Sequence, residues 1–467
     1  MKKIIVESLV LSQKTAVIED GRLTELFIED NLNNKIVSNI YRGIVKRVLP
    51  GLDACFVDIG FEKLAYLRLP KDKEIKAGQD ILVQVNKEEI GTKGAKLNLE
   101  ISLAGRYLVY IPSNDRVTMS NKITNEKERF RLKKVISSVN KENLGLIIRT
   151  EAQGCEHEEL KQDIENLKHK YETILKEYKL GIGPKLLYKE ADFSTKYVKE
   201  NVNDSVEKII TNSNSKYEEL KRVLKSINKS YIDKLFLEEN EDIFNLYKVD
   251  SQIEKVLNKK VWLKSGGYII IERTEALTVI DVNTGKFIGN GKLDETVYKT
   301  NLEAAKEIAM QLKIRDIGGI IIIDFIDMNK KKYQYEVIKT LQENLEKDKR
   351  KTEVLGMTKL GLVEVTRRRD KESIDKYYNI ECVCCNGNNN IKSVNYIIDK
   401  IEKEVMRIRT HTSYNDIRIQ LGSTVYNTIK EDFMEIIEKI IQKYSVIISL
   451  EPSDSIDNEK INIIYNK

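Results

Sequence analysis

The fold is decided by the stretch RDIGGIIIIDFIDM, residues 315–328, in which four consecutive isoleucines end in an aspartate. The apolar run Ile320–Ile323 predicts a β-strand that is buried on both faces. Working outward, strands are predicted at Tyr268–Glu272 and Ala276–Val282. Apolar residues at helical spacing predict helices that contain Glu303–Leu312 and Val337–Leu345. The region is therefore expected to form an α/β domain.

Two carboxylates and an amide lie where two of these strands end. Asp281 and Asn283 are two residues apart, so their side chains point to the same side of an extended strand. Asp324 ends the isoleucine strand, at the sheet edge where ligands collect in α/β folds. Such oxygen ligands suit Mg²⁺, which activates a bound water and neutralises charge on a scissile phosphate. The alternative is that both aspartates only cap strands or turns. Asp327 is expected to face the other way and to be structural.

Histidines are scarce, which bears on the mechanism. The sequence has only His157, His169 and His411, of which the first two fall in or beside one predicted helix. Acid–base catalysis by a pair of histidines is therefore poorly supported. Hydrolysis by a metal-activated water fits the residues better.

Six short motifs follow one another through this region: Gly266-Gly267, Glu275–Thr278, Ile280–Asn283, Thr300–Ala305, Arg315–Gly319 and Ile323–Met328. In this order they resemble the catalytic region of the ribonuclease E/ribonuclease G family. The resemblance implies that Asp281 and Asp324 hold magnesium and that Asn283 hydrogen-bonds to them or to the scissile phosphate. It also implies a compact, ribonuclease G-like endoribonuclease of ribosomal, transfer and messenger RNA. Its cuts would leave 5′-phosphate and 3′-hydroxyl ends.

The resemblance further implies the domain organisation. It predicts a discontinuous RNase H-like domain (1–34 and 191–257), an OB-fold barrel of the ribosomal S-one type (35–104), a 5′-monophosphate sensor region (105–190), a DNase I-like catalytic domain (258–378), a zinc link (379–394) and a small α/β oligomerisation domain (395–467). The residues support two of these parts directly. Residues 3–29 alternate as a β-meander with a turn at Asp20-Gly21, and residues 38–103 have the short-strand spacing of a five-stranded barrel.

Cys382 and Cys385 form a Cys-x-x-Cys pair, which can present two thiolates to one metal. A structural zinc needs four ligands, so two chains that share one Zn²⁺ would complete the site as a homodimer, or as a dimer of dimers (homotetramer). Cys384 as a ligand, a redox pair and inert thiols are the alternatives. The family has a Cys-Pro-x-Cys-x-Gly-x-Gly link, from which Val383 and Asn389 depart, and this puts the shape of the turn in doubt.

Candidate RNA-binding residues come from the barrel. Phe56 and Tyr66 match the family's two stacking phenylalanines, and Lys87 and Lys93 match its basic groove residues. Aromatic side chains on such a barrel stack single-stranded bases at roughly 1–3 kcal/mol each without needing a particular sequence. Taken alone, Phe56 would be assigned to the core and the two lysines to ordinary solvated surface.

Two arginine-containing segments are further candidates. Arg149 and Thr150 offer a guanidinium fork and a hydroxyl, which suit a terminal phosphate, and they match the family's 5′-monophosphate pocket. On its own this dipeptide would be read as a surface salt bridge. Arg367 and Arg369 follow the predicted strand Val363–Val365, share a side, and are expected to contact the phosphate backbone of RNA near the metal.

Composition sets the remaining limits. A net charge of +6 on a 54.0 kDa chain does not by itself demand nucleic acid. The sequence has no apolar stretch long enough to span a membrane, and its cysteines do not form a disulfide framework, so a cytoplasmic protein is expected. The alternatives to an endoribonuclease are a non-catalytic protein that binds RNA through the barrel and a metal-dependent DNA nuclease.

Overall fold

The first strand of the chain pairs with a strand that lies far along the sequence. In the computed structural model, β1 (Lys2–Ser8) runs parallel to β14 (Val206–Thr211), within a five-stranded sheet of order β15-β14-β1-β2-β3. Its other strands are β2 (Ser12–Glu19), β3 (Arg22–Asp30) and β15 (Leu235–Leu237), and the helices of the same region are α4 (Asn214–Ile227), α5 (Ile243–Leu246) and α6 (Val249–Leu257). Asp20 (φ 49°) and Gly21 (φ 81°) make the tight turn predicted between β2 and β3.

The structure describes residues 1–31, 36–70, 74–88, 94–285, 293–346, 348, 350–369, 373–381, 390–457 and 459–466. They divide into two compact units, one formed by residues 33–201 and the other by residues 1–32 together with 202–467. The first unit is thus an insertion into the second. None of the helices in the described ranges is both long enough and apolar enough to cross a membrane.

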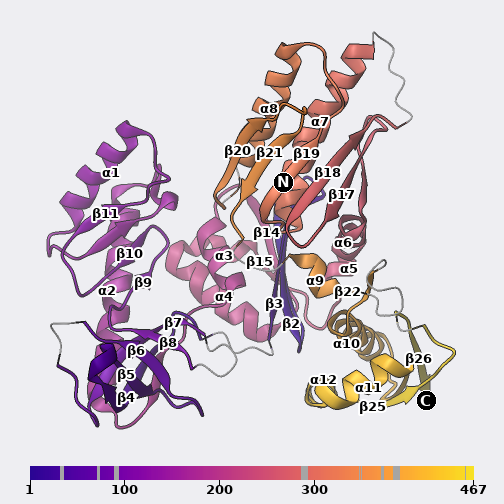
Figure 1. Ribbon diagram of the computed structural model, residues 1–467. Coiled ribbons are helices and arrows are strands. Elements are labelled where there is room, and N and C mark those ends of the chain that lie inside the picture. The colour runs from indigo at the N-terminus through magenta and orange to yellow at the C-terminus, as the bar shows by residue number, and fades with distance from the viewer. Residues whose placement is uncertain are drawn as a thin grey trace. The chain divides into compact units, whose positions relative to one another are not determined.

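The inserted unit begins with a closed five-stranded barrel (Figure 1). Its strands are β4 (Ile40–Leu49), β5 (Ala54–Asp58), β6 (Ala65–Arg68), β7 (Asp80–Lys87) and β8 (Lys96–Asn98), and pairing of β4 with β7 closes it. The predicted barrel is confirmed. A further strand, β13 (Lys185–Tyr188), also pairs with β4, and the sequence did not indicate this pairing.

The rest of this unit is a four-stranded sheet with three helices. The strands are β9 (Leu103–Ala104), β10 (Leu108–Tyr110), β11 (Val117–Met119) and β12 (Leu146–Ile148), and the helices are α1 (Glu126–Val139), α2 (His157–Leu180) and α3 (Phe193–Asn201). Buried Asp163 of α2 accepts the backbone N–H groups of Arg106, Tyr107 and Leu108, at 3.1, 2.8 and 3.0 Å. A single carboxylate thus ties α2 to the start of β10.

A six-stranded sheet of order β16-β17-β18-β19-β21-β20 forms the centre of the other unit. Its strands are β16 (Lys260–Trp262), β17 (Tyr268–Arg273), β18 (Leu277–Asn283), β19 (Gly319–Asp324), β20 (Thr352–Met357) and β21 (Val363–Arg367). Helices α7 (Leu293–Ile314) and α8 (Lys331–Leu345) pack on one face (Figure 1). The expectation that both faces of β19 are buried is wrong, because Ile321 and Ile323 are fully buried whereas Ile320 is 53% exposed.

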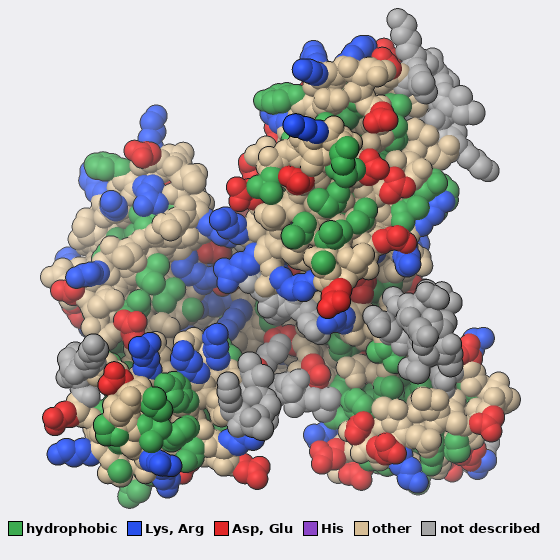
Figure 2. Space-filling model, viewed as in Figure 1, with side chains coloured by type: hydrophobic (Ala, Val, Ile, Leu, Met, Phe, Trp, Pro, Cys, Tyr) green, Lys and Arg blue, Asp and Glu red, His purple; other side chains and the backbone are tan. Residues whose placement is uncertain are grey.

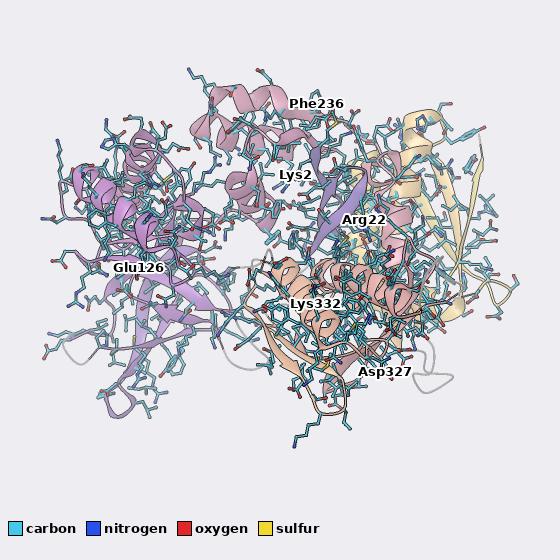
Figure 3. The ribbon with its side chains drawn as sticks, turned by 90° about the horizontal axis from the view of Figure 1, so that it is seen from above. Lys2, Arg22, Glu126, Phe236, Asp327 and Lys332 are labelled. Atoms are coloured by element: carbon cyan, nitrogen blue, oxygen red, sulfur yellow. The ribbon has the colours of Figure 1, made fainter. Side chains whose placement is uncertain are left out.

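Two ion pairs fasten this helical layer to the meander. Arg22 of β3 donates to Glu307 of α7 at 2.5 Å, and Lys313 pairs with Glu25 at 2.7 Å. Figure 3 shows Arg22 beside the helices of the six-stranded-sheet domain. These ion pairs therefore hold the meander against the helices of the six-stranded sheet.

The C-terminal region follows the six-stranded sheet. Its elements are α9 (Ile374–Tyr378), β22 (Asn379–Glu381), β23 (Asn390–Lys392), α10 (Val394–His411), β24 (Asp416–Leu421), α11 (Ser423–Asp432), α12 (Met434–Tyr444), β25 (Ile447–Pro452) and β26 (Ile461–Asn466). Helix α10 docks on β1 and β2 through buried ion pairs, Lys403 with Glu7 at 3.1 Å and Asp399 with Lys14 at 2.7 Å. Buried charges of this kind require partners, so the contact fixes where the small domain sits on the meander.

Candidate active site

Asp281 and Asp324 lie side by side at the ends of two parallel strands. The register of β18 and β19 places Asp281 directly opposite Asp324. Ile280 and Ile323 are fully buried under the helices, so the aspartates that follow them face the open side of the sheet. Asn283 lies on the same side, and its Nδ2 donates to Oδ2 of Asp281 at 2.7 Å. The structure therefore brings together the three residues that the sequence singled out.

These residues line a cavity of about 310 Å³, walled by Asp281–Thr284 and Asp324–Asp327. Asp327, labelled in Figure 3, lines the same cavity, contrary to the expectation that it faces away from Asp324. Because β19 ends at Asp324, the alternation of an extended strand does not continue to Asp327. The cavity therefore holds three acidic residues rather than two.

The electrostatics of the cavity favour a cation. Burial, the charge of Asp281 and the charge of Asp327 together raise the pKa of Asp324 above its ordinary value. A divalent ion would offset this repulsion between carboxylates, and two carboxylates with an amide are a donor set that Mg²⁺ accepts alongside several waters. Among the residues that the structure describes, there is no cluster of three or more His, Cys, Asp or Glu side chains arranged to hold a metal.

Helix α7 holds the loops on both sides of this cavity. Fully buried Asn301 donates from Nδ2 to the carbonyl of Ile326 at 2.8 Å and accepts the N–H of Ile326 at 3.2 Å. Two residues later, Glu303 accepts the backbone N–H groups of Lys264 and Ser265 at 2.6 and 3.1 Å. The sequence motif Thr300–Ala305 therefore contains positioning residues, which fix the segment after Asp324 and the turn before β17.

The turn before β17 also depends on a glycine. A Cβ added to Gly267 would lie 2.8 Å from the carbonyl oxygen of Asn283 and 3.1 Å from Cγ2 of Thr300. Only glycine leaves room for this approach between β17, β18 and α7. The close packing brings the end of β18, with Asn283, against the turn.

Arg367 and Arg369 are not near the carboxylates. Arg367 pairs with Gly319, at the opposite end of β19 from Asp324. Its guanidinium is buried, 3% exposed, and binds Asp316 at 3.0 Å and Asp348 at 2.8 Å. Arg369 is exposed and follows at the same end. The expectation that these arginines contact RNA near the metal is therefore corrected, because Arg367 stabilises the turn that leads into β19.

On the barrel, Phe56 and Tyr66 face outward. Their neighbours along β5 and β6 fill the barrel core, whereas the two aromatic rings pair across the strands with their centroids 6.3 Å apart. Arg47 lies opposite Phe56, and Lys96 lies opposite Tyr66. The four side chains form a row across adjacent strands, basic at each end and aromatic in the middle. We call it the barrel row.

The structure adds residues that sequence reasoning missed. Arg47 and Lys96 belong to the barrel row, and no motif marked them, because only the register across strands brings them beside the aromatic rings. Lys87 lies opposite Lys96 and extends the basic end of the row. Lys93 lies outside the described residues.

Arg149 and Thr150 follow β12, next to the end of β11. Arg149 donates to Glu200 at 2.5 Å and to the carbonyl of Gly105 at 2.9 Å, and it lies 3.5 Å from Glu151. The hydroxyl of Thr150 lies 3.2 Å from that of Ser120. Arg149 is therefore held by carboxylates, with which a phosphate would have to compete.

The predicted zinc ligands Cys382 and Cys385 lie outside the described residues, as do Val383 and Asn389. The strands that flank them in the sequence are paired, with Glu381 opposite Asn390. The two ends of the intervening segment therefore start from neighbouring positions.

This protein is a mixed α/β protein that has an inserted OB-like barrel and an acidic cavity. The profile of the "Ribonuclease E/G family" matches residues 102–370, and the chain belongs to this family. It is 41% identical over 417 residues to ribonuclease G of Haemophilus influenzae (strain ATCC 51907 / DSM 11121 / KW20 / Rd), covering 85% of each chain. It is 39% identical over 427 residues to ribonuclease G of Escherichia coli (strain K12), covering 87% of each. Ribonuclease E of the same Haemophilus strain is 31% identical over an alignment 488 positions long, which covers 99% of this chain and 52% of that protein.

Proposed function

We propose that this protein is an endoribonuclease that cuts single-stranded RNA by magnesium-assisted hydrolysis and leaves 5′-phosphate and 3′-hydroxyl ends. The observation that carries the proposal is the direct pairing of Asp281 with Asp324 inside an acidic cavity on an open sheet face. The relatives named ribonuclease G and ribonuclease E support RNA as the substrate. The reducing chemistry expected of the cytoplasm agrees with the free thiols of Cys55 and Cys155, both of which are buried.

Within this cavity each residue has a distinct task. Asp281 and Asp324 would hold Mg²⁺, which supplies an activated water and neutralises charge on the phosphate that is attacked. Asn283 orients the Asp281 carboxylate by donating to one of its oxygens. The amide oxygen of Asn283 takes no part in that bond and remains an acceptor. Asn301 keeps the segment from Phe325 to Asp327 in place, so that the cavity keeps its shape when RNA enters.

The barrel row would bind the single-stranded RNA. Two aromatic faces flanked by Arg47 and Lys96 suit unpaired bases joined by phosphates, and this arrangement does not require a particular sequence. A protein that only bound RNA would have no use for two paired carboxylates, whose mutual repulsion is unfavourable without a cation. The non-catalytic alternative is therefore less well supported.

A preference for a 5′-monophosphate is proposed for the Arg149–Thr150 corner. Ser120 joins it at 3.2 Å from Thr150, so two hydroxyls and one guanidinium meet at the ends of β11 and β12. A terminal phosphate carries more charge than an internal diester and competes better with Glu200 for Arg149. This supports a role for the corner in sensing the RNA end.

A shared zinc is proposed for Cys382 and Cys385, with two thiolates from each of two chains. Its test is the metal content of the purified protein together with its mass in solution. We expect one zinc for every two chains, and we expect Cys382→Ser to lose both the zinc and the dimer. A Cys382→Ser protein that keeps its zinc and its mass would contradict the shared site.

The proposed activity is tested by cleavage of a short, unstructured, 5′-monophosphorylated RNA in Mg²⁺ or in EDTA, beside a DNA of the same sequence. We expect cuts in RNA with Mg²⁺ only and expect the downstream product to carry a 5′-phosphate. Asp281→Asn and Asp324→Asn should abolish cutting and still bind RNA. Full activity in either variant would refute the assignment, and cutting of the DNA would move the protein to the DNA nucleases.

A further inference from the structure

The open face of the six-stranded sheet carries an aromatic group beside the carboxylates. Trp262 pairs with Tyr268 across β16 and β17, and Tyr268 pairs with Asn283 across β17 and β18. Directly paired residues of antiparallel strands point to the same face. Ile269, the next residue along β17 after Tyr268, points to the opposite face and is fully buried, whereas Trp262 is 62% exposed. Trp262 and Tyr268 therefore lie on the face that holds the acidic cavity.

A lysine completes this group. Nζ of Lys260 lies 3.7 Å from the centre of the Tyr268 ring and 4.2 Å from the centre of the Trp262 ring, and the two ring centroids are 5.4 Å apart. Lys260 has no carboxylate partner among the described residues, since the ion pair at this edge is that of Lys259 with Glu272. We call Lys260, Trp262 and Tyr268 the β16 platform.

We propose that the β16 platform stacks a base next to the scissile phosphate, with Lys260 contacting the RNA backbone. The inference rests on the proposed function, and it adds a subsite on the sheet itself to the barrel row. Trp262 is two strands from Asn283, which is about 10 Å at the spacing of a sheet. That distance suits a nucleotide adjoining the one whose phosphate occupies the cavity.

Chemistry favours RNA as the occupant over a second protein. An exposed tryptophan beside a tyrosine presents ring faces on which any base can stack. A lysine over those rings brings positive charge to where a phosphate backbone would run. The platform is also continuous with the acidic cavity through the Tyr268–Asn283 pair. Figure 2 shows hydrophobic side chains gathered together with acidic ones over the strands of this sheet.

The test uses the fact that Trp262 is the only tryptophan of the sequence, so its fluorescence reports on the platform alone. In the Asp324→Asn protein, which should bind without cutting, a 5′-monophosphorylated single-stranded RNA is titrated in Mg²⁺. We expect saturable quenching of Trp262. An abasic oligomer of the same length, which has the phosphates but no bases, should leave the fluorescence nearly unchanged.

A second experiment measures cleavage kinetics in proteins that keep Asp324. We expect Trp262→Ala to raise KM at least about fivefold, the change that corresponds to ~1 kcal/mol for one stacked base, with kcat nearly unchanged. Trp262→Phe should restore most of the loss, because it keeps a ring. Tyr335→Ala is the matched control, since Tyr335 is 67% exposed but lies on α8, in the helical layer.

Two results would overturn the inference while leaving the proposed function standing. One is unaltered Trp262 fluorescence on RNA binding together with a wild-type KM in Trp262→Ala. The other is a Trp262 signal that changes with protein concentration in the absence of RNA, which would assign the platform to a contact between chains. Absence of cleavage by the wild-type protein would instead count against the proposed function, and the fluorescence titration would still decide whether the platform binds bases.

Discussion

Asp281 and Asp324 are direct register partners on the parallel strands β18 and β19, and both face the uncovered side of the sheet. Parallel pairing brings the carboxyl ends of two strands to one edge, so it also brings together the acidic residues that end them. The cost is repulsion between carboxylates: burial raises the pKa of Asp324 most, and the charges of Asp281 and Asp327 raise it further. A bound cation would turn this repulsion into affinity.

The first prediction concerns the pH dependence of cleavage. Cation binding needs ionised Asp324, whose pKa is raised by burial, by Asp281 and by Asp327. Asp327→Asn removes the third of these causes, so the pKa of Asp324 should fall and the acid limb of the rate profile should move to lower pH. The measurement is the single-turnover rate against pH at subsaturating Mg²⁺. Glu343→Gln, a 58% exposed carboxylate on α8, is the control and should leave the limb in place. A limb that moves to higher pH in Asp327→Asn would contradict the prediction.

The second prediction concerns the barrel row. Replacement of Phe56 or Tyr66 by alanine should weaken binding of single-stranded RNA by about 1–3 kcal/mol each. Lys96→Gln should instead weaken binding with a smaller salt dependence, because one phosphate contact is lost. Binding is measured by fluorescence anisotropy of a labelled RNA at several salt concentrations. Phe130→Ala serves as the control, since Phe130 is 72% exposed on α1, outside the barrel. Wild-type affinity in both aromatic variants would exclude the row as the binding face.

The third prediction concerns the RNA end. Arg149→Ala should reduce the ratio of cleavage rates for 5′-monophosphorylated and 5′-hydroxyl RNA by about tenfold or more, as expected when a hydrogen bond to a charged group is lost. Glu200→Gln should act in the opposite sense, because the carboxylate that holds Arg149 at 2.5 Å loses its charge. The paired substrates differ only at their 5′ ends, so the ratio isolates the sensor. An unchanged ratio in Arg149→Ala would remove this corner from the proposed function.

The fourth prediction concerns stability rather than catalysis. Glu7 is fully buried, and burial raises its pKa to about 7 although Lys403 and Lys14 oppose the shift. An acid whose pKa is higher in the folded state binds protons more tightly there. It therefore contributes stability at low pH that is lost as pH rises from about 4.5 to about 7. The loss attributable to Glu7 is on the order of 3 kcal/mol.

Glu7→Gln should flatten this part of the profile of unfolding free energy against pH, as measured by urea denaturation from pH 4.5 to 7. Glu25→Gln is a comparison in the same meander, because Glu25 is also poorly exposed but pairs with Lys313. A wild-type slope in Glu7→Gln would mean that Glu7 is ionised throughout this range.

Local sequence patterns are enough to predict that Asp281, Asn283 and Asp324 lie together, but they do not predict the positions of the residues around them. A spacing of two residues is enough to place Asp281 and Asn283 on one side of a strand, and a carboxylate at the end of an apolar strand predicts the sheet edge. The position of Asp327 cannot be predicted in this way, because the two-residue period of a strand applies only while the chain stays extended, and β19 ends at Asp324. The position of Arg367 depends on the antiparallel pairing of β21 with β19, and the direction of that pairing cannot be predicted from either strand alone.

In the fold, too, local features can be predicted from the sequence, whereas long-range features cannot. The β-meander and the barrel can be predicted from the alternation of apolar and polar residues and from turn residues, which are local signals. The uncovered face of β19 and the platform beside the site depend instead on the order β16-β17-β18-β19, a long-range property. Isoleucines at four successive positions suggest burial on both faces, yet helices α7 and α8 cover only one.

The central claim is that Asp281 and Asp324 jointly hold one divalent cation. Its most direct test is Mn²⁺ binding, followed by electron paramagnetic resonance of free Mn²⁺ in titrations of the wild-type, Asp281→Asn, Asp324→Asn and Asp327→Asn proteins. We predict one site per chain in the wild type, its loss in both Asp281→Asn and Asp324→Asn, and a weakened site in Asp327→Asn. Wild-type Mn²⁺ affinity in both Asp281→Asn and Asp324→Asn would contradict the claim.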